Sequence, residues 1–118
     1  DERDIEEYLR ERLARIFGAQ KLEDRQTIIG SSTNPWDVSA IVQLNGDEVV
    51  FQAVGDHANS VYRTSAAFHD LAALPKPPKL VSVVKDKEAM GHKVTILSQA
   101  GRVIQSDQPD DIYLKAAA

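Results

Sequence analysis

Three polar residues are placed where they could form a binding or catalytic site. Asp37 and Ser39 stand at the start of one β-rich segment, and Gln52 stands near the end of the next. If the two segments pair as a hairpin, all three side chains share one face at the end remote from the turn, with Asp37 and Gln52 as diagonal neighbours. A carboxylate, a hydroxyl and a carboxamide gathered at a strand end indicate a site. In the alternative interpretation, Asp37 caps a loop and Gln52 contacts only water.

Other common chemistries have no motif in this chain. It contains no cysteine, which excludes disulfides, thiolate metal sites and cysteine nucleophiles. It has no glycine-rich phosphate-binding motif and no G-x-S-x-G turn of the α/β-hydrolases. The histidines, His57, His69 and His92, lack the spacing of a zinc site. Only His57 is close in sequence to the polar strand end.

The Asn45-Gly46 pair predicts how the two β-rich segments are joined. Asn-Gly is the preferred pair of a two-residue type I′ hairpin turn, and this turn sets the register. The resulting core face is Val38, Ala40, Leu44, Val42, Val49, Phe51 and Ala53, and the opposite face carries Asp37, Ser39, Ile41, Gln43, Glu48, Val50, Gln52 and Val54. On this basis Phe51→Ala is expected to cost about 3–5 kcal/mol, and Ser39→Ala is expected to cost little.

Further elements must flank this hairpin. Apolar residues at i, i+3 and i+4 spacing predict a helix over residues 2–17, and Gly18 ends it. A second helix is expected from Asn59 or Ser60 to about Leu74. Strands are expected over residues 25–30, 79–84 and 93–97, and the strand over 79–84 is expected to be interior. A short helix or turn is expected over 86–90 and a last short helix over 109–116. Gly101 precedes the run Arg102-Val103-Ile104-Gln105. The pattern predicts an α/β (α+β) fold with a single mixed sheet of about five strands, an N-terminal helix and a central crossover helix.

Composition restricts the class of protein. The 118 residues, 42% hydrophobic and 27% charged, indicate one globular domain spanning 1–118. No apolar run approaches the ~20 residues of a membrane span, and the absence of cysteine fits a cytoplasmic protein. The net charge of −4 offers no overall basic field for nucleic acid. The start at Asp1 indicates a trimmed end or a segment of a longer chain, and residues 116–118 fit either a native helix end or a cloning remnant.

The order helix, strand, hairpin, helix, strand resembles the PD-(D/E)xK, or restriction-endonuclease-like, fold. In that fold an acidic residue opens the second core strand and an (E/Q)-x-K motif lies on the third. Asp37, in Pro35-Trp36-Asp37, matches the metal-binding aspartate, and Gln52, in Gln52-Ala53-Val54, matches the Glu/Gln position. The resemblance implies that Asp37 and Gln52 are catalytic, metal-binding positions, to which Glu11 or Glu7 of the first helix could add a carboxylate.

Val54 departs from the family pattern, because the catalytic lysine belongs there. Valine can neither stabilise a charged transition state nor orient a water molecule, and the amide oxygen of Gln52 is a poorer Mg²⁺ ligand than a carboxylate. The following helix offers Arg63 but no lysine before Lys76. Asp37 and Gln52 are therefore vestigial candidates.

A closer resemblance is to small uncharacterised domains of phage and mobile-element origin that look like eroded versions of this fold. It covers about half the chain, along the segment that runs from Phe51 through residues 67–71 to residues 97–104. It implies a nuclease-like domain without catalysis or cofactor that has a binding or regulatory role. A protein partner is favoured, because an acidic domain would need a local basic patch to hold nucleic acid.

Two alternatives stay open. In the first, the domain is an active Mg²⁺-dependent nuclease with a rearranged site, in which Asp37, Gln52 and a glutamate of the first helix hold the metal and His57 or a displaced lysine assists a water molecule. In the second, the chain is an unrelated α/β protein-interaction module. The second predicts that Asp37 and Gln52 lie far apart or face solvent separately.

Overall fold

Helix α1 (Glu2–Phe17) is the first element of the computed structural model, which describes residues 2–118. Its residues Ile5, Leu9 and Leu13 recur every four positions and form one buried stripe. Acidic residues in the first turn stabilise the start of the helix. Gly18, with a φ of 95°, follows its end. The helix predicted over residues 2–17 is confirmed.

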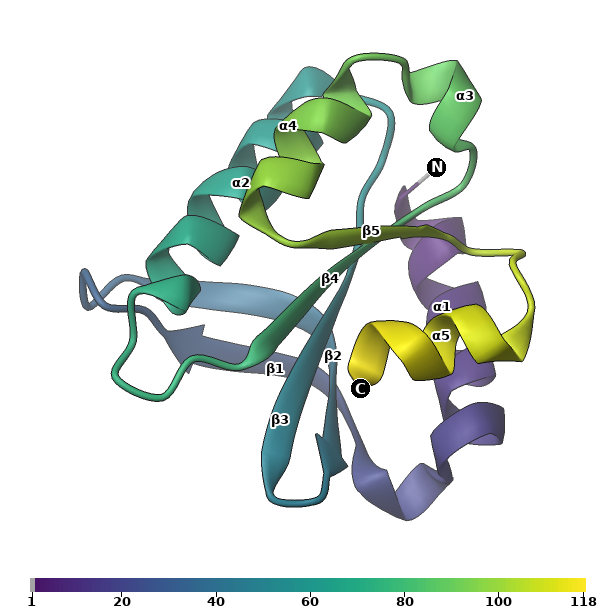
Figure 1. The fold of residues 1–118 in the computed structure, drawn as a ribbon. Helices are drawn as coiled ribbons and strands as arrows, with labels where there is room; N and C mark the ends of the chain where they lie inside the picture. Colours follow the sequence, from purple (N-terminus) through teal and green to yellow (C-terminus); the bar gives the residue numbers. More distant parts are fainter. Residues whose placement is uncertain (1) are drawn as a thin grey trace.

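Five strands form one mixed sheet in the order β1-β2-β3-β4-β5 (Figure 1). They are β1 (Leu22–Ile29), β2 (Pro35–Leu44), β3 (Asp47–Ala53), β4 (Lys79–Val84) and β5 (Arg102–Gln105). β2 is antiparallel to both β1 and β3, whereas β4 is parallel to β3 and β5 is parallel to β4. The predicted fold class is confirmed: an α/β fold with one mixed sheet and an N-terminal helix.

Helices supply the connections that parallel strands require. α2 (Ala58–Ala72) joins β3 to β4, and α3 (Lys87–Met90) with α4 (Lys93–Ala100) joins β4 to β5. The short helix η1 (Ala19–Lys21) follows α1, and α5 (Asp110–Ala117) follows β5. α1 and α5 cover one face of the sheet, and α2 and α4 cover the other (Figure 1). None of the helices described within residues 2–118 has the length and apolar character needed to cross a membrane.

The hairpin has the predicted register. Asn45 and Gly46 both have positive φ, 51° and 83°, as a type I′ turn requires. The paired residues, Leu44 with Asp47, Val42 with Val49 and Ala40 with Phe51, are those expected from the sequence. The turn residues therefore determine which side chains of β2 and β3 face each other.

The strict alternation of β2 breaks at Ser39. Ala40 lies in the core cluster under α1 and α5, as predicted, but Val38 packs with Ile41 and Val50 on the face covered by α2. The prediction of a single core face is therefore wrong, because helices bury both faces of the sheet. At Ser39 the chain also loses its bridge partner in β1, where Arg25 has a φ of 46°.

The strand predicted over residues 93–97 is wrong, because this segment belongs to helix α4. A short apolar run does not distinguish a strand from a buried helix. Leu97 and Ala100 are buried and Val94 is partly buried, a spacing of three that suits a helix packed on α2. The fifth strand is β5, the run after Gly101.

Helix α2 begins earlier than the capping residues suggested. Its N-cap position is His57 rather than Asn59 or Ser60, and the His57 side chain makes no capping hydrogen bond. The Ser60 hydroxyl instead accepts a hydrogen bond from the Gly55 N–H, at 3.0 Å. This contact fixes the turn that leads from β3 into the helix.

Candidate binding cleft

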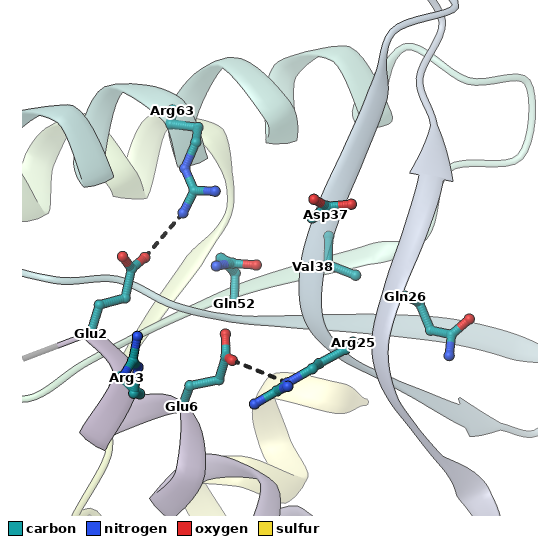
Figure 2. Close-up of a pocket in the computed structure, with 9 residues that line it drawn as sticks. All are labelled: Glu2, Arg3, Glu6, Arg25, Gln26, Asp37, Val38, Gln52 and Arg63. Atoms are coloured by element: carbon teal, nitrogen blue, oxygen red, sulfur yellow. Dashed lines mark hydrogen bonds and ion pairs between the residues drawn. The ribbon is translucent and has the colours of Figure 1, made fainter.

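A polar cleft lies where α1 and α2 meet the end of the hairpin remote from its turn. Its volume is about 570 Å³. Five elements, α1, β1, β2, β3 and α2, contribute its walls, which consist of Glu2, Arg3, Glu6, Arg25, Gln26, Asp37, Val38, Gln52 and Arg63 (Figure 2). We call this cavity the polar cleft. It brings Asp37 and Gln52 together, on the same side of the molecule as the start of α1.

The cleft forms where side chains replace the ladder between β2 and β3. The Ser39 N–H donates to Gln52 Oε1, and the Ala53 N–H donates to Ser39 Oγ, both at 3.0 Å. Gln52 Nε2 donates to the Ala53 carbonyl at 3.0 Å. Because Gln52 is only 6% exposed and both ends of its carboxamide bond backbone atoms, its role here is to hold the two strands.

Two ion pairs span the polar cleft (Figure 2). Arg63 Nη2 lies 3.1 Å from Glu2 Oε1, and Arg25 Nε lies 3.8 Å from Glu6 Oε1. Gln52 lies between the two pairs. Each arginine comes from a different element, α2 or β1, and each pairs with a glutamate of α1, so the charges of the cleft are largely matched within the chain.

Glu6 connects the cleft to the hairpin. It accepts hydrogen bonds from Ser39 Oγ at 2.9 Å and from Arg10 Nη1 at 2.8 Å. Partial burial opposes ionisation of Glu6, but these hydrogen bonds and the charges of Arg10 and Arg25 outweigh it and lower the pKa below 4.5. Glu6 is therefore an anion in the folded protein at neutral pH.

Arg25 occupies a backbone conformation that is unusual for its residue type. Its φ of 46° lies in the left-handed region, which costs energy for a residue with a Cβ. The position faces Ser39, where the bridge pattern between β1 and β2 is interrupted. The strain thus coincides with the cleft, and it interrupts the regular strand at the point where the arginine reaches Glu6.

Asp37 is the one predicted site residue with an exposed charge at the cleft. Its Oδ1 accepts a hydrogen bond from the hydroxyl of Thr27, the residue opposite it on β1, at 2.8 Å. Within residues 2–118 no arginine, lysine or histidine forms an ion pair with it. Asp37 also lines a second, smaller cavity beside Trp36.

Several residues suggested by the sequence lie elsewhere. Glu11 and Glu7 are exposed on α1 and do not line the cleft. His57 is exposed at the start of α2 and does not line it either. Val54, which the resemblance aligns with the nuclease lysine, is 1% exposed and packs with Val61, Val84, Met90 and Leu97.

Glu2, Glu6 and Arg25 were not predicted as site residues, and Arg63 was considered only as a replacement for the missing lysine. A signal was present, because Glu2 and Glu6 precede Ile5 and Leu9 by three residues each and so flank the apolar stripe. No comparable pattern marks the two arginines, whose positions depend on tertiary packing.

The proposed metal ligands do not fit a divalent cation. Gln52 Oε1 already accepts a hydrogen bond from a backbone N–H, and Glu11 does not line the cleft. The carboxylates that do line the cleft from α1 are paired with arginines. Among the described residues, no three histidine, aspartate or glutamate side chains are grouped as a metal site.

Comparisons with protein families, with curated proteins and with solved structures found no match to this chain.

Proposed function

We propose that this chain is a non-catalytic, nuclease-like domain with a binding or regulatory role in a phage or mobile-element context, and that the polar cleft is its binding surface. The nuclease-like part of the proposal is supported by the order of elements, α1, β1, the β2–β3 hairpin, α2 and β4, which is the order on which the resemblance rests. It is also supported by the cleft that Asp37 and Gln52 share. An unrelated module would not require these two residues to line one cavity.

The observation that carries the non-catalytic part is the use made of Gln52. A catalytic oxygen must be available to a metal or a reactant, but this carboxamide is buried and bonded to Ser39 N and Ala53 O. At the lysine position, Val54 points into an apolar cluster. Gln52 and Val54 thus serve the packing of the sheet, while Asp37, the third residue that matches the nuclease motif, stays exposed at the cleft.

A protein partner is favoured over nucleic acid by the charges. The chain carries a net charge of −4, and the arginines at the cleft are accompanied by Glu2, Glu6 and Asp37. Duplex DNA is bound mainly through neutralisation of phosphates by clusters of lysine and arginine. A cleft with matched charges does not supply such a cluster, whereas protein interfaces commonly combine both signs.

The proposal is tested by a metal titration combined with a cleavage assay. Mg²⁺ and Mn²⁺ are added to ¹⁵N-labelled protein, and the same sample is incubated with supercoiled plasmid. We expect no cleavage and no saturable shift of the Asp37 and Gln52 amide signals. Metal-dependent cleavage that Asp37→Ala abolishes and Asp24→Ala leaves intact would overturn the proposal in favour of the Mg²⁺-dependent nuclease.

A binding measurement separates the two classes of partner. Fluorescent duplex and single-stranded DNA are titrated with the protein at low salt, where phosphate contacts are strongest. We expect no saturable binding. Binding that is lost in the Arg25→Ala, Arg63→Ala double variant, but kept in Arg102→Ala on the exposed surface of β5, would replace the protein partner by nucleic acid.

A further inference from the structure

A second cavity adjoins the polar cleft and differs from it in character. Its volume is about 240 Å³, and it shares Asp37, Val38, Gln52 and Arg63 with the polar cleft. Its other walls include Trp36, Thr64, Ala67 and Phe68, so one side is apolar and aromatic. We call it the Trp36 cavity. Pockets for whole small molecules measure about 300–1,000 Å³, and this smaller volume suits a single side chain.

The aromatic wall of the Trp36 cavity is fixed in place. The indole N–H of Trp36 donates to Asp70 Oδ2 at 2.8 Å, and Asp70 lies on α2. Asp70 also accepts from Ser32, through the backbone N–H and the hydroxyl, at 2.8 and 2.7 Å. These three bonds lower the pKa of Asp70, so it is ionised at neutral pH and holds the ring. The ring is therefore preorganised before a ligand arrives.

The charge at the mouth of this cavity is negative. Of the two charged side chains that line it, Arg63 is neutralised by Glu2 across the polar cleft. Asp37 has only the neutral hydroxyl of Thr27 as a partner among residues 2–118. A cation that enters the cavity would meet an exposed carboxylate without having to break an ion pair.

Thr64, which also lines this cavity, carries a buried hydroxyl. Thr64 is 2% exposed, and no group in the described part of the chain bonds its Oγ1. Buried polar groups are nearly always hydrogen-bonded, and Thr64 lines the Trp36 cavity. Its unsatisfied oxygen can accept a hydrogen bond from a ligand that binds beside it in the cavity.

From these features we infer that the Trp36 cavity receives an arginine side chain of a protein partner. The guanidinium is planar and stacks on aromatic rings, which suits Trp36. It carries several donors, which Asp37 and Thr64 Oγ1 can accept in different directions. Lysine lacks the planar group that would stack on the ring. The inference rests on the proposed function, because it names the chemistry of the partner at the same site.

The test uses Trp36 as its own reporter, because it is the only tryptophan of the chain. Its fluorescence is followed during titration with N-acetyl-arginine amide, N-acetyl-citrulline amide and N-acetyl-lysine amide at constant ionic strength. Citrulline has the shape of arginine without its charge. We expect saturable binding of the arginine compound, and binding weaker by roughly tenfold or more for citrulline. The Thr64 amide and Trp36 indole signals should shift in ¹⁵N spectra of the same complex.

Variants assign the binding to the cavity. Asp37→Asn keeps the size of the side chain and should weaken arginine binding roughly tenfold or more. Asp24→Asn removes an exposed carboxylate of β1 that lines neither cavity, and it should leave binding unchanged. Thr64→Val keeps the shape and should weaken binding several-fold. Circular dichroism of each variant establishes that it is folded.

Three results would overturn the inference: no saturable fluorescence change, equal binding of citrulline and arginine, or equal weakening by Asp37→Asn and Asp24→Asn. Each of these, with no metal-dependent cleavage, would leave the proposed function standing. Metal-dependent cleavage with arginine binding intact would overturn the proposed function and not the cavity assignment. The two proposals therefore fail in different experiments.

Discussion

Ser39 and Gln52 show how single side chains shape the candidate site. Each replaces a backbone partner: Gln52 Oε1 takes the Ser39 N–H, and Ser39 Oγ takes the Ala53 N–H. The Ser39 hydroxyl also donates to Glu6, which brings α1 to the strand end. Two polar residues thus satisfy the backbone of the separated strands and leave room for the polar cleft.

Removing the Ser39 hydroxyl tests this arrangement. Ser39 is 1% exposed, and in Ser39→Ala the buried Ala53 N–H loses its acceptor. We expect the free energy of unfolding to fall by about 1–3 kcal/mol in urea titrations. This corrects the expectation from sequence that the substitution costs little. Phe51→Ala, at a fully buried ring beside Phe17 and Tyr113, should still cost more, about 3–5 kcal/mol.

Ser98→Ala is the matched control, because the Ser98 hydroxyl is exposed and donates to the Thr95 carbonyl within its own helix. Its effect should stay within about 0.5 kcal/mol. If Ser39→Ala destabilised the protein no more than Ser98→Ala, the Ala53 N–H would have another hydrogen-bond partner in solution. The role assigned to the Ser39 and Gln52 side chains in joining β2 to β3 would then be wrong.

The site could be predicted from sequence only where local rules determine it. Asn45-Gly46 sets the hairpin register, which brings the start of β2 beside the end of β3, where Asp37 and Gln52 line one cleft. Gln52 joins β2 to β3 only because the alternation of side chains between the two faces of β2 breaks at Ser39, and no residue pattern predicts this break. The ion pairs of Arg25 and Arg63 depend on how β1 and α2 pack against α1, so they were not predictable.

Among the elements, α1 and α5 are joined by a buried arginine. The Arg12 guanidinium donates to Gln108 O at 2.8 Å, Ser106 O at 3.2 Å and Asp110 Oδ1 at 2.7 Å. It also lies 4.6 Å from the centre of the Tyr113 ring. Arg12 therefore satisfies the carbonyls of the loop between β5 and α5 and holds that loop on the first helix.

Arg12→Lys tests this contact between elements. Lysine keeps the charge but cannot present donors in three directions within one plane, so carbonyls of the loop lose partners. We expect the free energy of unfolding to fall by roughly 2–3 kcal/mol. Arg15→Lys, on the exposed side of the same helix, should change it by less than about 0.5 kcal/mol. Equal effects of the two variants would contradict the role assigned to Arg12.

Elements were predictable where their pattern was long. α1, with sixteen residues of regular apolar spacing, and β4, with a continuous apolar run, have the expected ranges. The strand predicted over residues 93–97 was wrong because five residues are too few to define a hydrophobic period. The segment instead forms a helix that packs against α2. The start of α2 was predicted wrongly, because the hydroxyl of Ser60, a good capping residue, accepts a hydrogen bond from the Gly55 N–H instead of capping the helix.

For the whole molecule, the charged groups predict how stability depends on pH. Burial opposes ionisation of Glu6, but its hydrogen bonds and cationic neighbours outweigh burial and lower its pKa in the folded state. Hydrogen bonds from Trp36 and Ser32 lower the folded-state pKa of Asp70. The pKa in the unfolded chain is about 4.5 for Glu6 and about 3.8 for Asp70. At a pH above these values both carboxylates stabilise the fold, and this contribution is lost as the pH falls through their lower pKa values in the folded state. Asp70→Asn should flatten the acid side of a urea-midpoint profile, whereas Asp24→Asn should not.

Tyr113 contributes to the alkaline side of the same profile. This ring is fully buried, and its hydroxyl donates to the Ser106 carbonyl at 2.7 Å. Burial raises its pKa from 10.0 to about 12, although the charge of Arg12 acts in the opposite direction. Because the folded pKa is the higher one, the contribution of Tyr113 is complete below pH 10 and is lost as the pH rises towards 12. A tyrosinate absorbance titration should therefore contain one step near pH 12 that is absent in Tyr113→Phe. The urea midpoint should also fall less steeply between pH 10 and 12 in that variant than in the unmodified protein. A tyrosinate step unaffected by Tyr113→Phe would mean that the ring is not held in the core shared by α1, α5 and the sheet.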